Sequence, residues 1–154
     1  MPPEVRSATV DDLPAVLHLY EQLYPGLAVR AGSRTEHAWA MTLATPQRTV
    51  LVAEVEGVVV GTADLTVLAN TARAGQPYLL VENVVVDRAH HRRGVGTALM
   101  SAAREHAEAA GCYKLQLSAD EASAYAFYEA AGFRPAARTY KQYLYASESV
   151  PVPE

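Results

Sequence analysis

Hydrophobic residues recur along this chain at two spacings, and their alternation predicts a mixed fold of strands and helices. Helical spacing begins at Leu13 and continues to Tyr24, where Pro25-Gly26 ends the helix. A second helix is expected from near Ser33 to the stop at Pro46. Runs rich in β-branched residues predict strands at residues 5–8, 49–54, 58–68, 78–87, 113–118 and 138–145. Two later helices are expected at residues 97–110 and 122–131, each closed by a glycine.

Local signals indicate how these elements begin and join. Thr9, followed three residues later by Asp12, resembles a capping box with Asp in place of Glu, just before the first helix. Glu56-Gly57 is typical of a tight turn between two hairpin strands. No linker or repeat interrupts the pattern, so residues 1–146 are predicted to form one domain. Residues 147–154, which contain two prolines, are expected to be a frayed tail.

Composition and charge narrow the classes of partner. Half of the 154 residues are hydrophobic and 19% are charged, which is typical of a globular protein. The net charge of −4 argues against nucleic acid as the main partner. The single cysteine, Cys112, excludes an intrachain disulfide, and the five histidines lack the spacing of metal ligands, so no metal is expected. Without an apolar run near ~18 residues or a signal-peptide core, a cytoplasmic protein with no membrane contact is expected.

A basic loop with two glycines stands out against the acidic background. Three arginines and two histidines lie between positions 88 and 93, and Gly94 and Gly96 follow where a helix is expected to begin. Unpaired N–H groups and the helix dipole make such a helix start a binding site for phosphate. A plain strand-to-helix turn would also need these glycines, Gly94 for a positive φ and Gly96 for close packing. A dinucleotide-binding fingerprint fits less well, because it requires glycine at Leu99.

Two segments resemble a known family. The run His91-Arg92-Arg93-Gly94-Val95-Gly96 resembles the acyl-coenzyme A pyrophosphate loop of the GNAT superfamily of N-acetyltransferases. Residues 124–133, which end in Gly132-Phe133, resemble a second motif of that family. The order of the expected elements over residues 5–145 is also similar. The resemblance implies an α+β fold whose mostly antiparallel sheet is splayed between its fourth and fifth strands to admit acetyl-coenzyme A (acetyl-CoA).

The resemblance also implies which residues hold this cofactor. They are Val84, Val85, Val86, His91, Arg92, Arg93, Gly94, Val95, Gly96, Thr97, Ala124 and Phe127. His91 stands where the family prefers Gln or Arg, although Arg92 and Arg93 keep the loop cationic. Glu121 stands where many members carry an asparagine that touches the cofactor, so that contact is not carried over.

Glu82 and Tyr128 are the candidate catalytic residues. Acetyl transfer to an amine needs a base that accepts the ammonium proton and an acid that protonates the leaving thiolate. Glu82 lies mid-strand among apolar residues, where partial burial would suit it to accept a proton, directly or through a water; alternatively it faces solvent or pairs with a cation. The Tyr128 phenol can donate a proton, or it can be a core aromatic. A backbone N–H from a bulged strand around residues 84–86 is expected to stabilise the oxyanion.

The acceptor is expected to be a small polar amine. Residues 81–86 and 111–114 are similar to segments of family members that acetylate glucosamine 6-phosphate. Tyr24, Arg30 and Glu82 are the candidate acceptor-binding residues. A protein N-terminal or lysine acetyltransferase and a non-catalytic acyl-CoA-binding module stay open as alternatives. The tyrosine-rich last strand suggests a homodimer edge.

Overall fold

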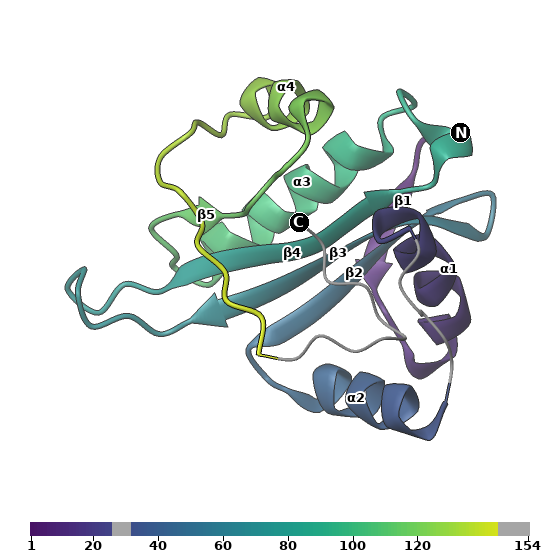
Figure 1. Ribbon diagram of the computed structural model, residues 1–154, viewed down its shortest axis with the longest axis horizontal. Coiled ribbons are helices and arrows are strands. Elements are labelled where there is room, and N and C mark those ends of the chain that lie inside the picture. The colour runs from purple at the N-terminus through teal and green to yellow at the C-terminus, as the bar shows by residue number, and fades with distance from the viewer. Residues whose placement is uncertain (26–31, 145–154) are drawn as a thin grey trace.

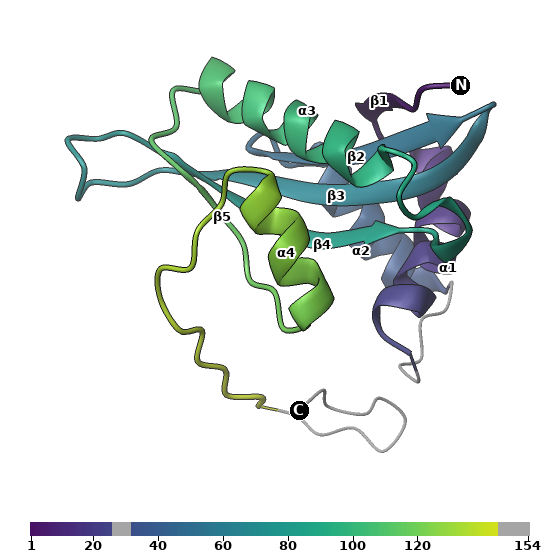
Figure 2. The ribbon, with the colours of Figure 1, turned by 90° about the horizontal axis from the view of Figure 1, so that it is seen from above.

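A sheet with helices on both faces forms the framework of the protein (Figures 1 and 2). The computed structural model describes residues 1–25 and 32–144. In chain order the elements are β1 (Glu4–Ser7), the 3-10 helix η1 (Val10–Asp12), α1 (Leu13–Leu23), α2 (Ser33–Ala44), β2 (Arg48–Val55), β3 (Val58–Leu68), β4 (Tyr78–Val86), η2 (Arg88–His90), α3 (Val95–Ala109), β5 (Leu115–Gln116) and α4 (Ala122–Ala130). The strands of the described residues lie in the order β1-β2-β3-β4-β5, and neighbours are antiparallel except β4 and β5.

Each face of the sheet has its own hydrophobic core. Successive side chains of a strand point to opposite faces, so Leu51 and Ala53 of β2 pack under α3, whereas Val50 and Val52 pack under α1 and α2. The α3 core also contains Leu65, Leu79, Val81, Leu99 and Ala103, and the other core contains Leu13, Val16 and Trp39. Figure 2 shows α3 and α1 on opposite sides of the sheet. The predicted amphipathic helices therefore cover the two opposite faces of the sheet.

β4 and β5 touch along only a short stretch. Two residue pairs join them, Leu79 with Leu115 and Leu80 with Gln116. β4 continues to Val86, while the chain after β5 turns away toward α4 (Figure 2). The expected splay between the fourth and fifth strands is thus confirmed.

The sequence prediction is wrong at the C-terminal end of the described chain. The strand expected at residues 113–118 is reduced to Leu115–Gln116, and residues 138–144 form no strand. Tyr140 is 86% exposed and Leu144 81% exposed. Alternation produces a strand only where a neighbouring edge supplies ladder hydrogen bonds. Among the described residues this segment has a side-chain contact instead, between the Ser118 and Thr139 hydroxyls at 2.8 Å.

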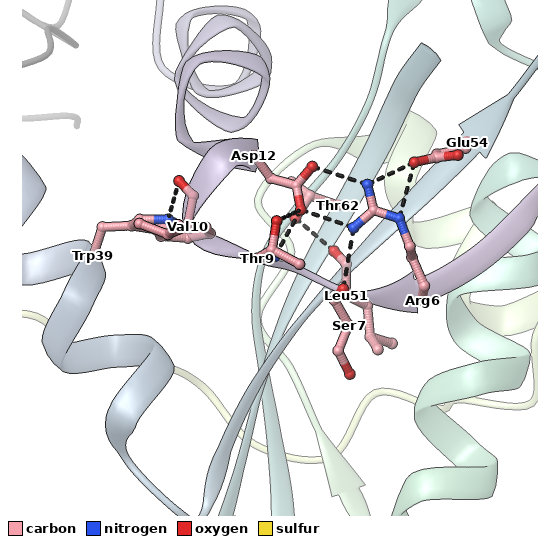
Figure 3. A network of polar contacts seen from close by, with 9 residues as sticks. All are labelled: Arg6, Ser7, Thr9, Val10, Asp12, Trp39, Leu51, Glu54 and Thr62. Carbon is pink, nitrogen blue, oxygen red and sulfur yellow. Dashed lines mark hydrogen bonds and ion pairs between the residues drawn. The ribbon is translucent and has the colours of Figure 1, made fainter. Parts of the chain in front are cut away.

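An arginine-centred network fixes the entry into α1 (Figure 3). Arg6 of β1 donates from Nη1 and Nη2 to both carboxylate oxygens of Asp12, at 2.8 and 2.9 Å, and from Nε to Glu54 of β2 at 2.9 Å. The same Asp12 carboxylate accepts the Thr9 backbone N–H at 2.7 Å, as the capping pattern predicted. One guanidinium therefore ties two strands to the start of a helix.

Candidate active site

The basic loop leads into α3 through two left-handed residues. Arg92 has a φ of 60° and Gly94, the residue that precedes α3, has a φ of 83°. Among the described residues, no backbone or side-chain acceptor takes the N–H groups of residues 92–97, and the first helical bond is Ala98 N–H to the Gly94 carbonyl at 3.0 Å. The loop and the first turn of α3 therefore present a row of free donors at the positive end of a helix dipole.

Some side chains of the loop contact the rest of the protein, and others are exposed to solvent. Val95 is 1% exposed and belongs to the α3 core, so only its backbone faces the loop. The His91 ring places Nε2 2.9 Å from the Val86 carbonyl and so closes the turn after β4. Arg92, Arg93 and Thr97 are exposed, and neither arginine has an acidic partner within the described part of the chain. The positive charge of the loop is left uncompensated.

Gly96 allows α4 to approach α3. A Cβ at this position would lie 3.0 Å from Cζ and 3.1 Å from Cε1 of Phe127. Both structural reasons for the glycines, a positive φ at Gly94 and close packing at Gly96, therefore hold, and they leave the N–H groups of the loop free. The contact brings α4, with Ala124, Phe127 and Tyr128, to the first turn of α3.

Tyr128 sits between two aromatic rings. Its ring centroid lies 5.1 Å from that of Phe127 and 5.7 Å from that of Phe133, both edge-on. The side chain is half-buried, and burial raises its pKa above the usual phenol value. Its hydroxyl has no hydrogen-bond partner among the described residues. The phenol is therefore protonated, and its O–H donates to no other described group.

β4 contains one extra residue. Thr62 of β3 pairs with Val85, but two residues later Asp64 pairs with Glu82, three residues earlier on β4. The additional position lies beside Asn83, whose φ of 51° is left-handed, a region that asparagine tolerates better than most residues. A bulge is thus present beside residues 84–86, and Val84 and Val86 point to the α3 core.

Glu82 lies on the opposite face from α3 and is exposed. The expectation of partial burial is wrong, because the apolar neighbours Val81, Val84 and Val86 belong to the α3 core. Its cross-strand partner Asp64 is 4% exposed and accepts from Arg48 Nε at 3.0 Å and Nη2 at 2.6 Å. These bonds to Asp64, and to a lesser extent the charge of Glu82, raise the pKa of Arg48.

Tyr24 reaches the bulge from the end of α1. Its hydroxyl donates to Asn83 Oδ1 at 3.0 Å. Burial raises the pKa of Tyr24; the positive charge of Lys141 opposes this rise, and the negative charges of Glu82 and Asp120 add to it by smaller amounts. Tyr24 and Glu82 thus lie close together, and their role in binding the acceptor stays a prediction. Arg30, the third predicted acceptor residue, lies outside the described residues.

Metal-binding and membrane-spanning features are absent from the part of the chain that the structure describes. No group of three or more His, Cys, Asp or Glu side chains could hold a metal ion there. No helix within residues 1–25 and 32–144 is long and apolar enough to cross a bilayer.

Comparison with known proteins fits this arrangement. The model of the acetyltransferase (GNAT) family matches residues 13–133. The chain belongs to this family. A GNAT protein is an enzyme, an acetyltransferase, and the glycine loop and the α4 motif lie within the matched range.

Several relatives resemble this GNAT protein over different lengths. A glucosamine 6-phosphate N-acetyltransferase of Trypanosoma brucei brucei is 38% identical over 78 residues, 51% of this chain and 52% of the relative. The chain thus matches about half the length of that curated relative. A provisionally named acetyltransferase of Agrobacterium tumefaciens superposes with a TM-score of 0.86 at 34% identity, over 91% of this chain and 99% of the other. An acetyltransferase of Trypanosoma brucei superposes with a TM-score of 0.81 at 28% identity, over 92% of this chain and 99% of the other.

Three polar residues that lie near Glu82 were not singled out in the sequence. Asn83, Asp64 and Arg48 all lie near Glu82, on β4, β3 and the start of β2. Asp64 and Asn83 each interrupt an apolar strand, and that interruption is the signal that could have found them. No such signal marks Arg48, because a cation at the start of a strand is common on solvated surfaces.

Proposed function

We propose that this enzyme transfers the acetyl group of acetyl-CoA to a primary amine of a small polar molecule by direct attack in a ternary complex. The divergence of β4 from β5 carries the proposal. After Leu80, no described residue pairs with β4 on its β5 side. The free N–H groups of residues 92–97 follow the end of β4, and Glu82 lies on β4 two residues after Leu80, the last residue that pairs with β5. An elongated donor and a separate acceptor can meet at such a place.

The chemistry of the loop fits a diphosphate. Backbone N–H groups without acceptors and the uncompensated Arg92 and Arg93 supply donors and charge of the required sign. Val95 would contribute through its backbone alone, because its side chain is in the core. Phe127 and Ala124 on α4 would line the same side.

Acid and base approach the reacting bond from different sides of β4. Acetyl-CoA supplies an activated thioester, and a new N–C bond replaces its C–S bond. Glu82 accepts the proton that the acceptor ammonium loses, directly or through a water, and a backbone N–H at the bulge stabilises charge on the carbonyl oxygen. Tyr128, protonated because burial raises its pKa, donates its proton to the departing sulfur, and the second proton that the attacking nitrogen loses restores the phenol. Burial also raises the pKa of the Cys112 thiol, which disfavours an acyl-cysteine route.

The acceptor assignment has a narrower basis. The partial match to a glucosamine 6-phosphate N-acetyltransferase points to an amino sugar, and aminoglycosides and amino acids are chemically related candidates. The exposed carboxylate of Glu82 offers one negative charge to an ammonium group, since Arg48 already neutralises Asp64.

Thiol release from acetyl-CoA tests the proposal across a panel of amino sugars, aminoglycosides, amino acids and short peptides. We expect release with small amines, and intersecting double-reciprocal lines when both substrates are varied. A Cys112→Ala control should keep the rate, because direct transfer does not use the thiol. Release with peptides alone would identify a protein acetyltransferase. Tight acetyl-CoA binding without release for any amine would indicate a non-catalytic binding module.

A further inference from the structure

Glu82 and Asn83 are consecutive residues of a strand that face the same side of the sheet. Regular alternation would send them to opposite faces. The left-handed φ of Asn83 and the extra residue break the alternation at this point. Glu82 pairs with Asp64 on the neighbouring strand β3, and Asn83 accepts a hydrogen bond from Tyr24 just after α1, whereas Val81 and Val84 pack on the α3 side. The bulge therefore presents two polar side chains side by side.

The Asn83 amide has hydrogen-bonding capacity left. A primary amide carries one carbonyl acceptor and two N–H donors. Tyr24 uses the carbonyl at 3.0 Å. The amide also lowers the pKa of Tyr20 against the larger opposite effect of burial, an interaction that occupies at most one N–H. The other N–H has no partner among the described residues.

We propose that Asn83 is an acceptor-binding residue and that Glu82 and Asn83 together select amines with a hydroxyl on the neighbouring carbon, that is, 1,2-amino alcohols. This rests on the proposed amine acetylation. The Glu82 carboxylate holds the nitrogen of the acceptor, and the remaining Asn83 N–H donates to its hydroxyl oxygen. The two Cα atoms are about 3.8 Å apart, so the two side chains address adjacent groups of one small molecule.

The surroundings of Asn83 support binding of a neutral group. Arg48, a nearby cation, is engaged with Asp64 through two hydrogen bonds. The Tyr24 hydroxyl holds the amide through its Oδ1 atom, so the orientation of the amide is set before a substrate arrives. A preorganised neutral donor discriminates by hydrogen bonding rather than by charge.

A matched pair of acceptors tests the proposal: trans-2-aminocyclohexanol and cyclohexylamine, which differ by one hydroxyl. The quantity to measure is the ratio of their kcat/KM values. We expect the unmodified enzyme to prefer the amino alcohol about tenfold, the worth of one hydrogen bond. In Asn83→Gly, which keeps the left-handed backbone without the amide, the ratio should fall to within about twofold of one.

Two further variants separate the amide from the backbone. Asn83→Ala also removes the amide but strains the left-handed position. It should therefore melt at a lower temperature than Asn83→Gly and show the same loss of preference. Asn70→Gly, in the loop after β3, should keep the original ratio, because its side chain bonds locally to Ala72 N–H.

Several outcomes would overturn the proposal. An original enzyme without preference, or a preference that survives in Asn83→Gly, would remove Asn83 from acceptor recognition. If the preference for the amino alcohol is lost in Asn83→Ala but kept in Asn83→Gly, the selectivity depends on the backbone conformation at residue 83 and not on the amide. If neither cyclohexyl compound reacts while other small amines do, the inference fails and the acetyl-transfer proposal stands. If no amine reacts at all, both fail.

Discussion

Single residues of β4 decide which chemical groups reach each face of the sheet. Val81, Val84 and Val86 join the α3 core, and Glu82 with Asn83 faces α1. One inserted position therefore separates the apolar side chains that pack on α3 from the polar side chains that we propose bind the acceptor. Charge at this place is balanced by the Arg48–Asp64 pair, so Glu82 carries the uncompensated negative charge.

Replacing the carboxylate of Glu82 tests the base. In Glu82→Gln the shape is kept and proton acceptance is lost, so kcat/KM for the amine should fall about 10²- to 10⁴-fold. The acidic limb of the pH–rate profile should lose the contribution of this group. Glu105→Gln, at an exposed position on α3, is the control. An unchanged profile in Glu82→Gln would remove Glu82 from the role of base.

Replacing the phenol of Tyr128 tests the acid. Tyr128→Phe should lower kcat at saturating acetyl-CoA by about tenfold or more, with a small change in KM because the ring contacts persist. Since burial raises the pKa of Tyr128, its ionisation should not reduce kcat anywhere below about pH 10. Tyr125→Phe, on the same helix and 46% exposed, should retain full turnover. Full turnover in Tyr128→Phe would refute the assignment.

At the scale of elements, the contact between α3 and α4 positions the proposed donor site. Gly96 sits in the first turn of α3, directly against the Phe127 ring. A helix interior otherwise favours alanine over glycine by about 1 kcal/mol. Close approach, rather than helix propensity, therefore explains the glycine.

Adding one methyl group at Gly96 should disturb this contact. Gly96→Ala must push Phe127 away by several tenths of an ångström, so we expect α4 to shift and KM for acetyl-CoA to rise about tenfold. Phe127→Leu removes the ring atoms that the new methyl group would contact. Combined with Gly96→Ala, it should therefore lower the KM for acetyl-CoA part of the way back to the original value. Equal KM values for Gly96→Ala and the original enzyme would show that the packing has no effect on the donor.

Over the whole molecule, the hydrogen bonds of Arg6 join elements that are distant in the chain. They link β1, β2 and the entry to α1 through Asp12 and Glu54 (Figure 3). Hydrogen bonds from Arg6 and from the Thr9 backbone lower the pKa of Asp12 to about 2, against a desolvation effect that raises it. The folded protein therefore favours the ionised carboxylate more than the unfolded chain does.

The sign of this shift sets a pH dependence of stability. The contribution of Asp12 is fully present above the unfolded carboxyl pKa near 3.9 and is lost as the pH falls to about 2. Because the Arg6 side chain is 40% exposed, we expect about 1–2 kcal/mol. Urea unfolding of Asp12→Asn at pH 7 should show this loss, and the loss should shrink toward pH 2. Asp11→Asn, at the exposed neighbouring position, should change stability by less than about 0.5 kcal/mol.

The elements that sequence reasoning located best are those with long periodic patterns. The first two helices and β3 lie within a few residues of their expected bounds, because apolar periodicity is enforced by burial. The strand expected at residues 138–145 fails over its described part, since a strand depends on a partner edge that no local pattern encodes. The strand-to-helix turn at Gly94 and Gly96 was predicted correctly, because these glycines meet two local requirements, a positive φ and a close contact.

The sequence by itself determined the family and the basic loop, and it named Glu82, Tyr128 and Tyr24 as candidate site residues, because each stands in a local pattern. The tertiary structure alone decided which of them meet. Asn83 joins Tyr24 and Glu82 because a bulge shifts the alternation of β4 by one residue, and that shift exists only in the pairing of β4 with β3. Exposure of Glu82 and the bond between Arg48 and Asp64 likewise follow from strand register, which depends on partners distant in the chain.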